Sequence, residues 1–187
     1  MKSILRKIFG QAQVEKQGGC KADKPLDERF ASHFTENGGR FLYCEDRQKA
    51  LAYFQNIRLE CNWTHFNCPA RDLASWLKTL GLSPQNPRVA EANLMYCECM
   101  VASKGSIILS SHQTFGKRLA ELSDNYVIVG KVDQIVNSIS DGLRLIKSRK
   151  SGNIPSNIAS ITGRDVGQEL GENLGVPKNI YLLLVEN

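Results

Sequence analysis

The segment SIILSSHQTFGKRLAELSDNYVIV, residues 106–129, has the pattern of a strand, a helix and a second strand. Its two ends, residues 106–110 and 126–129, are short and largely apolar, which is typical of strands buried on both faces of a sheet. We expect residues 115–122, between them, to form a helix. Because a crossover of this kind joins parallel strands, the segment predicts an α/β domain.

The same alternation continues on both sides of this segment. We expect helices over residues 25–35, 46–58, 69–80, 132–146 and 165–174. We expect strands over residues 40–44, 61–67, 157–162 and 180–185, while residues 88–103 mix features of strand and helix. These elements predict one α/β domain over residues 25–187, with an open, mostly parallel sheet and helices on both of its faces.

The first 24 residues differ from this domain. Residues 2–12 have apolar residues at helical spacing and a basic face, which fits a short docking helix, or a helix on a membrane surface or a partner. Residues 13–24 have the composition of a flexible linker. No apolar run approaches the roughly 18–20 residues of a membrane span, and no secretory signal is recognisable, so we expect a cytoplasmic protein.

The amino-acid composition excludes few further classes of function. The 187 residues are 42% hydrophobic and 23% charged, which is sufficient for a packed core. The net charge of +5 is weak and spread along the chain, so we expect no nucleic-acid partner. The sequence has no glycine-rich phosphate or dinucleotide motif, so no recognisable motif encodes a cofactor and the sequence leaves any cofactor unknown.

Cysteine and histidine residues form two patterns that could bind a metal. One consists of Cys61, His65 and Cys68, and the other is the pair Cys97 and Cys99. Neither has the usual ligand spacing of zinc or of an iron–sulfur cluster. We therefore expect reduced and mostly buried cysteines, and no metal site.

Three polar loops are candidate binding regions, because ligands of open α/β folds bind beyond the carboxyl ends of strands. The first contains Lys104-Gly105-Ser106, where a glycine beside a lysine and a serine could hold an anion or form an ordinary turn. The second is Ser-Ser-His-Gln-Thr at residues 110–114, which suits a polar small molecule but could also cap the next helix.

The third loop, Thr162-Gly163-Arg164-Asp165, follows an expected strand and begins an expected helix. Helix amides and the Arg164 guanidinium would favour a carboxylate or phosphate, although Asp165 could instead serve only as a helix cap. We expect the three loops to meet over one edge of the sheet and to form one pocket for a small anionic ligand.

Residues 97–111 resemble the central motif of the LUD domain family, which includes lactate-utilisation protein C. That motif has an acidic residue, a Thr-Gly-Thr/Ser step, an apolar strand and two serines, and the corresponding residues here are Glu98, Lys104-Gly105-Ser106 and Ser110-Ser111. Residues 153–163 and 177–184 resemble the last strands of the family. The resemblance covers roughly residues 40–187.

This resemblance implies a fold like that of ribose-5-phosphate isomerase and the CoA transferases. It also implies a role in oxidising L-lactate to pyruvate, beside iron–sulfur partner proteins. The chain departs from the family pattern at Lys104, where threonine is usual, and after Gly163, where the following segment is shorter and different. A non-catalytic assembly protein, or a phosphosugar or CoA-type transferase, is therefore an alternative.

The candidate site follows from the loops and the resemblance together. We predict Glu98 as an acid/base group or polar anchor, and Lys104 and Arg164 as the cations that hold a negative charge. The remaining predicted ligand-binding residues would orient the ligand through hydroxyl groups or main-chain amides, and they are Gly105, Ser106, Ser110, Ser111, Thr162 and Gly163.

Overall fold

The computed structural model describes residues 24–149, 155–163 and 175–186. Its elements are, in chain order, α2 (Leu26–Glu36), β1 (Arg40–Cys44), α3 (Arg47–Glu60), β2 (Phe66–Asn67), α4 (Arg71–Thr79), β3 (Ala92–Tyr96), β4 (Cys99–Val101), β5 (Ser106–Ser110), α5 (Ser111–Thr114), η1 (Leu119–Glu121), β6 (Asn125–Lys131), η2 (Val132–Gln134), β7 (Ile135–Val136), α6 (Ile139–Arg149), β8 (Ile158–Gly163) and β9 (Val176–Val185). The segments expected over residues 1–24 and 165–174 lie, apart from Lys24, outside the described residues.

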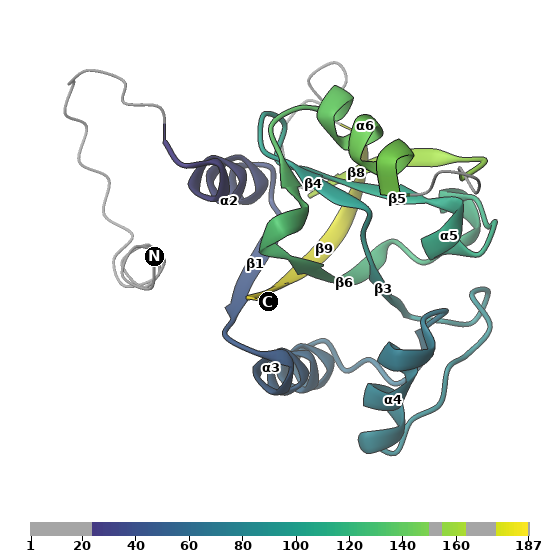
Figure 1. The fold of residues 1–187 in the computed structure, drawn as a ribbon. Coiled ribbons are helices and arrows are strands. Elements are labelled where there is room, and N and C mark those ends of the chain that lie inside the picture. Colours follow the sequence, from purple (N-terminus) through teal and green to yellow (C-terminus); the bar gives the residue numbers. More distant parts are fainter. Residues whose placement is uncertain (1–23, 150–154, 164–174, 187) are drawn as a thin grey trace.

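Strand β9 joins two halves of one nine-stranded sheet (Figure 1). Its carboxyl-terminal part lies between β6 and β1 in a wholly parallel half with the order β2-β3-β6-β9-β1. Its amino-terminal part pairs with β8 and leads through β5 and β4 to β7, and β5 is antiparallel to both of its neighbours. The predicted α/β class with a mostly parallel sheet is therefore confirmed.

Two apolar cores lie on opposite faces of the parallel half. Phe54 of α3 and Trp76 of α4 pack with Phe66 on one face. On the other face, Phe30 of α2 packs in the same core as Ile107 of β5. Because β5 contributes to that core, the mixed half of the sheet folds over the parallel half, and α6 covers its outer side (Figure 1).

Several elements form where local signals predict them. Proline precedes α2, and the Asp46 carboxylate caps α3 by accepting a hydrogen bond from the Lys49 amide at 2.7 Å. Helix α4 ends before Gly81, whose φ of +72° suits glycine. The predicted helices over residues 25–35, 46–58 and 69–80 are confirmed, as are the strands over residues 40–44, 157–162 and 180–185.

The connection expected within residues 106–129 is wrong. Both strands form, but the helix predicted over residues 115–122 is reduced to the single 3-10 turn η1. Phe115 and Gly116 have positive φ values of 51° and 74°, which end α5 after one turn and prevent a continuous helix. Strand β5 then pairs with β4 and β8 rather than with β6.

The helix predicted over residues 132–146 also begins later than expected. The branched residues Ile135 and Val136 pair as β7 with Met100 and Val101 of β4, so they belong to the sheet. Helix α6 starts after Ser138, whose hydroxyl accepts from the Asp141 amide while the Asp141 carboxylate accepts from the Ser138 amide.

No helix in the described parts of the chain combines the length and the apolar character that crossing a membrane requires.

Candidate functional site

The strand register places the three predicted loops at two ends of β5. Strand β8 runs antiparallel to β5, so Ser106 lies opposite Thr162 and Ser110 lies opposite Ile158. Ser106 and Ser110 are four positions apart along β5, which separates the two ends of the strand by about 13 Å. The expectation that all three loops meet over one edge is therefore wrong, because antiparallel pairing sends the carboxyl ends of β5 and β8 in opposite directions.

One end holds Lys104, Gly105 and Ser106 beside Thr162 and Gly163. Arg164, the residue predicted to hold an anion there, lies outside the described residues. The other end holds Glu98 with Ser110 and Ser111. The predicted site residues thus form two separate groups.

The end around Lys104 packs tightly on the carboxyl end of α2. The side-chain nitrogen Nδ2 of Asn37 donates to the Lys104 carbonyl at 2.8 Å, and His33 Nδ1 donates to the Ala102 carbonyl at 2.7 Å. A side chain at Gly105 would overlap the main chain of His33, and one at Gly163 would overlap that of Gly39. Close packing therefore accounts for both glycines, and their part in ligand binding stays a prediction.

The Ser106 and Thr162 hydroxyls lie at this same end. Both are buried, and neither has a hydrogen-bond partner within the described segments. The role predicted for Ser106 and Thr162 in ligand binding therefore stays a prediction.

The other end is built around a buried carboxylate. Glu98 is 7% exposed, and its Oε1 lies 2.6 Å from the Ser110 hydroxyl. Ser110 is also the N-cap of α5, and its hydroxyl accepts from the His112 amide at 3.2 Å. Glu98 therefore holds the residue from which α5 begins.

Gln113 completes the capping box of this short helix. Its Oε1 accepts from the Ser110 amide at 2.9 Å, which fixes which end of the side-chain amide is oxygen. The Ser110 hydroxyl also lies 2.7 Å from this oxygen, but its single proton can be given either to Gln113 or to Glu98. No partner for Gln113 Nε2 is found in the described part of the chain, so this nitrogen keeps its donor capacity.

A pocket of about 350 Å³ lies next to Gln113. Among the described residues, its walls come from residues 69–71 after β2, residues 95–96 at the end of β3, and the α5 region. The lining residues are Pro69, Ala70, Arg71, Met95, Tyr96, His112, Gln113 and Phe115. Strands β2 and β3 are parallel, so the pocket lies beyond their carboxyl ends. Open α/β sheets bind ligands at this position.

Of the predicted site residues at this end, Ser111 forms hydrogen bonds to the segment that leads into β8. Its hydroxyl accepts from the Ser156 amide at 3.1 Å, and its own amide donates to the Asn157 carbonyl at 2.8 Å. Ser110, Ser111 and Glu98 do not line the pocket, whereas His112 and Gln113 do.

Tyr96 belongs to a charged network beside the pocket. Its hydroxyl donates to the Asp72 carboxylate, and Arg47 pairs with the same carboxylate at 3.5 Å and stacks on Trp76. Burial and the contact with Asp72 raise the pKa of Tyr96 to about 12. Although burial raises the pKa of Asp72, the Tyr96 hydroxyl, main-chain amides and Arg47 outweigh it and lower that pKa below its usual value. Asp72 is thus a charge-compensated carboxylate.

Arg71 and Tyr96 are pocket residues that the sequence analysis did not identify. Arg71 begins α4 directly after β2, and Tyr96 ends β3. Both residues follow or end a parallel strand, and this position in the sequence is typical of ligand-binding residues in open α/β sheets. The sequence pattern does not identify Tyr96, because residues 88–103 mix features of strand and helix. It does not identify Arg71, because the preceding strand β2 is only two residues long.

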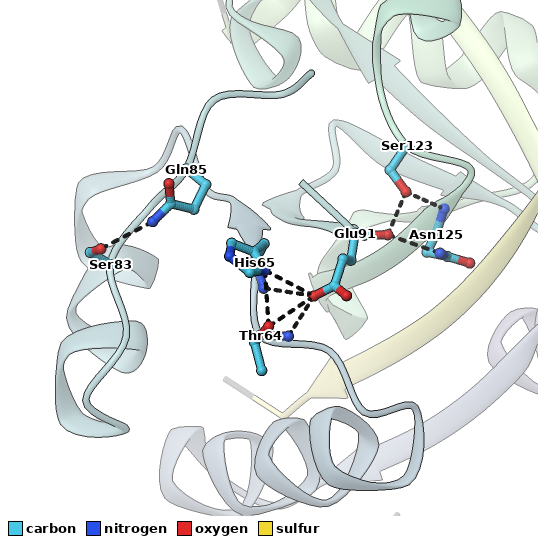
Figure 2. A network of polar contacts seen from close by, with 7 residues as sticks. All are labelled: Thr64, His65, Ser83, Gln85, Glu91, Ser123 and Asn125. Carbon is cyan, nitrogen blue, oxygen red and sulfur yellow. Dashed lines mark hydrogen bonds and ion pairs between the residues drawn. The ribbon is translucent and has the colours of Figure 1, made fainter. Parts of the chain in front are cut away.

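The two cysteine patterns are dispersed. His65 binds Thr64 and Glu91 (Figure 2), while Cys61 lies 3.3 Å from the Tyr181 hydroxyl. Cys97 lies in the core that contains Phe30, whereas Cys99 packs in a third cluster with Ile146 of α6. Burial raises the pKa of the Cys68 thiol and that of the Cys99 thiol to about 12. Within the described segments, no three His, Cys, Asp or Glu residues are grouped as metal ligands, and the predicted lack of a metal site stays a prediction.

A sequence model of the LUD domain matches residues 88–185, which is just over half of the chain. The chain belongs to the LUD domain family. The match covers the strands from β3 to β9 and includes the pocket residues that follow Ala92. Residues 69–71 lie before it, so in this LUD domain protein the preceding segment completes the pocket.

A solved structure supports the fold of this LUD domain protein. It is the crystal structure of a DUF162 family protein from Deinococcus radiodurans, with a TM-score of 0.62 and 19% identity, over 86% of this chain and 96% of that one. At this identity the likeness shows the fold alone. No curated protein matches. The implied likeness to ribose-5-phosphate isomerase and the CoA transferases stays a prediction.

Proposed function

We propose that this LUD domain protein binds a small carboxylate of the lactate and pyruvate class in the pocket beyond β2 and β3. The observation that carries the proposal is the convergence of Arg71, His112 and Gln113 on one pocket. A guanidinium, an imidazole and an amide nitrogen can all donate hydrogen bonds to a carboxylate. The pocket also lies where open α/β folds bind their ligands.

The surroundings suit an anion. Asp72, the nearest carboxylate to Tyr96, is paired with Arg47 and accepts the Tyr96 hydroxyl, so its charge is compensated. Glu98 does not line the pocket, and it holds Ser110, on which Gln113 depends. We therefore assign Glu98 a positioning role, in place of direct acid/base contact.

In this proposal the protein is a cytoplasmic subunit of an organic-acid oxidation system, with L-lactate as the reference substrate. The sequence contains neither a dinucleotide motif nor the cysteine spacing of an iron–sulfur cluster. Electron transfer would accordingly belong to iron–sulfur partner proteins, and this chain would hold the organic acid.

Ligand binding by the purified chain tests this proposal. We expect L-lactate or pyruvate at 100 times its dissociation constant to stabilise the fold by about 2.7 kcal/mol, measured by thermal unfolding. Arg71→Ala should weaken binding by about tenfold or more, because a charge-assisted hydrogen bond is lost. Arg144→Ala is the matched control, since Arg144 lies on the exposed side of α6.

Two results of this binding experiment would contradict the proposed function. If no small carboxylate shifts the unfolding temperature, or if Arg71→Ala binds as tightly as the wild type, the pocket is not an anion site. The non-catalytic assembly role predicts that first result.

A further inference from the structure

The pocket is larger than a three-carbon acid requires. An engineered apolar cavity of about 150 Å³ is sufficient to bind benzene. The pocket here measures about 350 Å³ and is partly open to solvent. L-lactate has six non-hydrogen atoms, as many as benzene, so the pocket has room for a larger acid.

The walls of the pocket are apolar away from its donors. Besides the fully buried Met95 of β3, the apolar residues that line the pocket are Pro69, Ala70 and Phe115. The donors Arg71 and Gln113 come from the same two segments as these apolar residues. The pocket therefore presents donors and apolar surface to the same ligand, which is typical of sites for amphipathic small molecules.

Phe115 has an unusual conformation that exposes its ring beside this pocket. Its φ is 51°, a left-handed value that bulky side chains rarely adopt, and its side chain is 71% exposed. Such conformations are energetically costly and cluster at ligand sites. An exposed aromatic ring on a pocket rim can cover the apolar part of a bound molecule.

Resting on the proposed function, we infer that the bound acid carries a bulky apolar group, as an aromatic or branched 2-hydroxy or 2-oxo acid does. Its carboxylate binds Arg71 and Gln113, and its apolar group packs on Ala70 and Phe115. An aryl-substituted lactate such as L-phenyllactate has twelve non-hydrogen atoms, twice as many as benzene, and the pocket has about twice the volume of a cavity that binds benzene.

The test is an affinity series on the full chain by isothermal titration calorimetry. The ligands are L-lactate, L-2-hydroxyisocaproate, L-phenyllactate and the uncharged amide of phenyllactate. We expect L-phenyllactate to bind at least about 30-fold more tightly than L-lactate, with 2-hydroxyisocaproate between them, because each buried methylene adds about 0.8 kcal/mol. The amide should bind at least about tenfold more weakly than the acid.

Phe115→Ala separates the apolar contact from the anion contact. We expect it to weaken L-phenyllactate binding by about fivefold or more while L-lactate binding changes by less than about twofold. Because the ring is exposed, this variant does not disturb a core. Val89→Ala is the control, since Val89 is a comparably exposed apolar residue outside the pocket.

The outcomes separate this inference from the proposed function. Equal affinities for L-lactate and L-phenyllactate, or no effect of Phe115→Ala, would overturn the inference and leave the anion site standing. If the amide binds as tightly as the acid, the anion site fails although the apolar preference is retained. No binding of any acid overturns both.

Discussion

Glu91 joins two loops at the amino end of β3. Its Oε2 accepts from the Thr64 amide at 2.7 Å and the His65 amide at 2.9 Å, and His65 Nδ1 lies 3.4 Å away (Figure 2). Its main-chain carbonyl accepts from Ser123 and Asn125. One residue thereby ties the entry of β2 to the entry of β6, at the end of the sheet opposite the pocket.

Glu91→Gln should reduce stability in a pH-dependent way. The amides of Thr64 and His65 lower the pKa of Glu91 below its usual value of 4.5, despite the opposing effect of burial. A lowered folded pKa stabilises the protein above about pH 4.5, and this contribution is lost as the pH falls through the folded pKa. We expect the variant to lose about 1 kcal/mol at pH 7, a low value for a charged hydrogen bond because the side chain is 40% exposed.

Urea unfolding at pH 7 and in acid checks this prediction. The stabilities of the wild type and Glu91→Gln should converge as the pH falls, whereas the exposed control Glu60→Gln should differ from the wild type by only a few tenths of a kcal/mol at each pH. A constant difference at all pH values would mean that the charge of Glu91 is irrelevant.

Gly105 is a second position where a single residue matters. It has a φ of 57°, and a methyl group there would overlap the main chain of His33. We expect Gly105→Ala to destabilise the fold by about 2–4 kcal/mol, which combines left-handed strain with a backbone clash. Gly81→Ala is the control, because Gly81 has a φ of 72° and open space around it, so it should lose about 1 kcal/mol. Equal losses in denaturant unfolding would contradict the packing explanation.

At the scale of elements, the helices differ in how much they depend on local signals. Helix α3 has a side-chain cap at Asp46, a full fourteen residues and an apolar face buried against β1 and β9. Helix α5 has only one turn and depends on Ser110, Gln113 and Glu98. The pocket is thus bordered by a short helix whose position depends partly on Ser110 and Glu98, which do not line the pocket.

Asp46→Ala should destabilise the protein by about 1 kcal/mol, since the Lys49 amide loses its acceptor at the start of α3. Asp46→Asn should retain most of this stability, because asparagine caps helices about as well. Thermal and urea unfolding of the two variants provide the measurement. If both variants lose equally, the charge and not the cap would be the source of the effect.

At the scale of the molecule, the apolar cores enclose most of the described thiols. Cys44, Cys68, Cys97 and Cys99 are buried, while Cys61 is partly exposed. Burial raises the pKa of Cys44 to about 12 and raises that of Cys97 even further, so few of these thiols are thiolate near neutral pH. Their reactivity should report the integrity of the whole fold.

Alkylation at pH 8 should therefore modify Cys61 at least about tenfold faster than these four cysteines, because the thiolate is the reactive form and must be accessible. In urea the rates should become similar. Peptide mass spectrometry measures each cysteine separately. Rapid native labelling of Cys99, which packs beneath Gly142 of α6, would show that α6 does not protect the mixed half of the sheet.

The candidate site could be predicted in part. Ser110, Gln113 and their neighbours stand directly after a buried strand, and that position alone marked the loop that borders the pocket. Thr162 could not be excluded in the same way, because nothing in its own sequence shows that β8 runs against β5. Arg71 could not be predicted as a pocket residue, because the strand before it, β2, has only two residues.

Local interactions explain what could be foreseen in this chain. The α/β class, the helix caps and most strand positions depend on apolar spacing and on side chains within a few residues of one another, and these are visible in the sequence. Strand direction and order depend on which backbones pair across the whole chain, as when β9 joins β6, β1 and β8. That long-range pairing separates the predicted loops and assembles the pocket, so only the folded protein could reveal it.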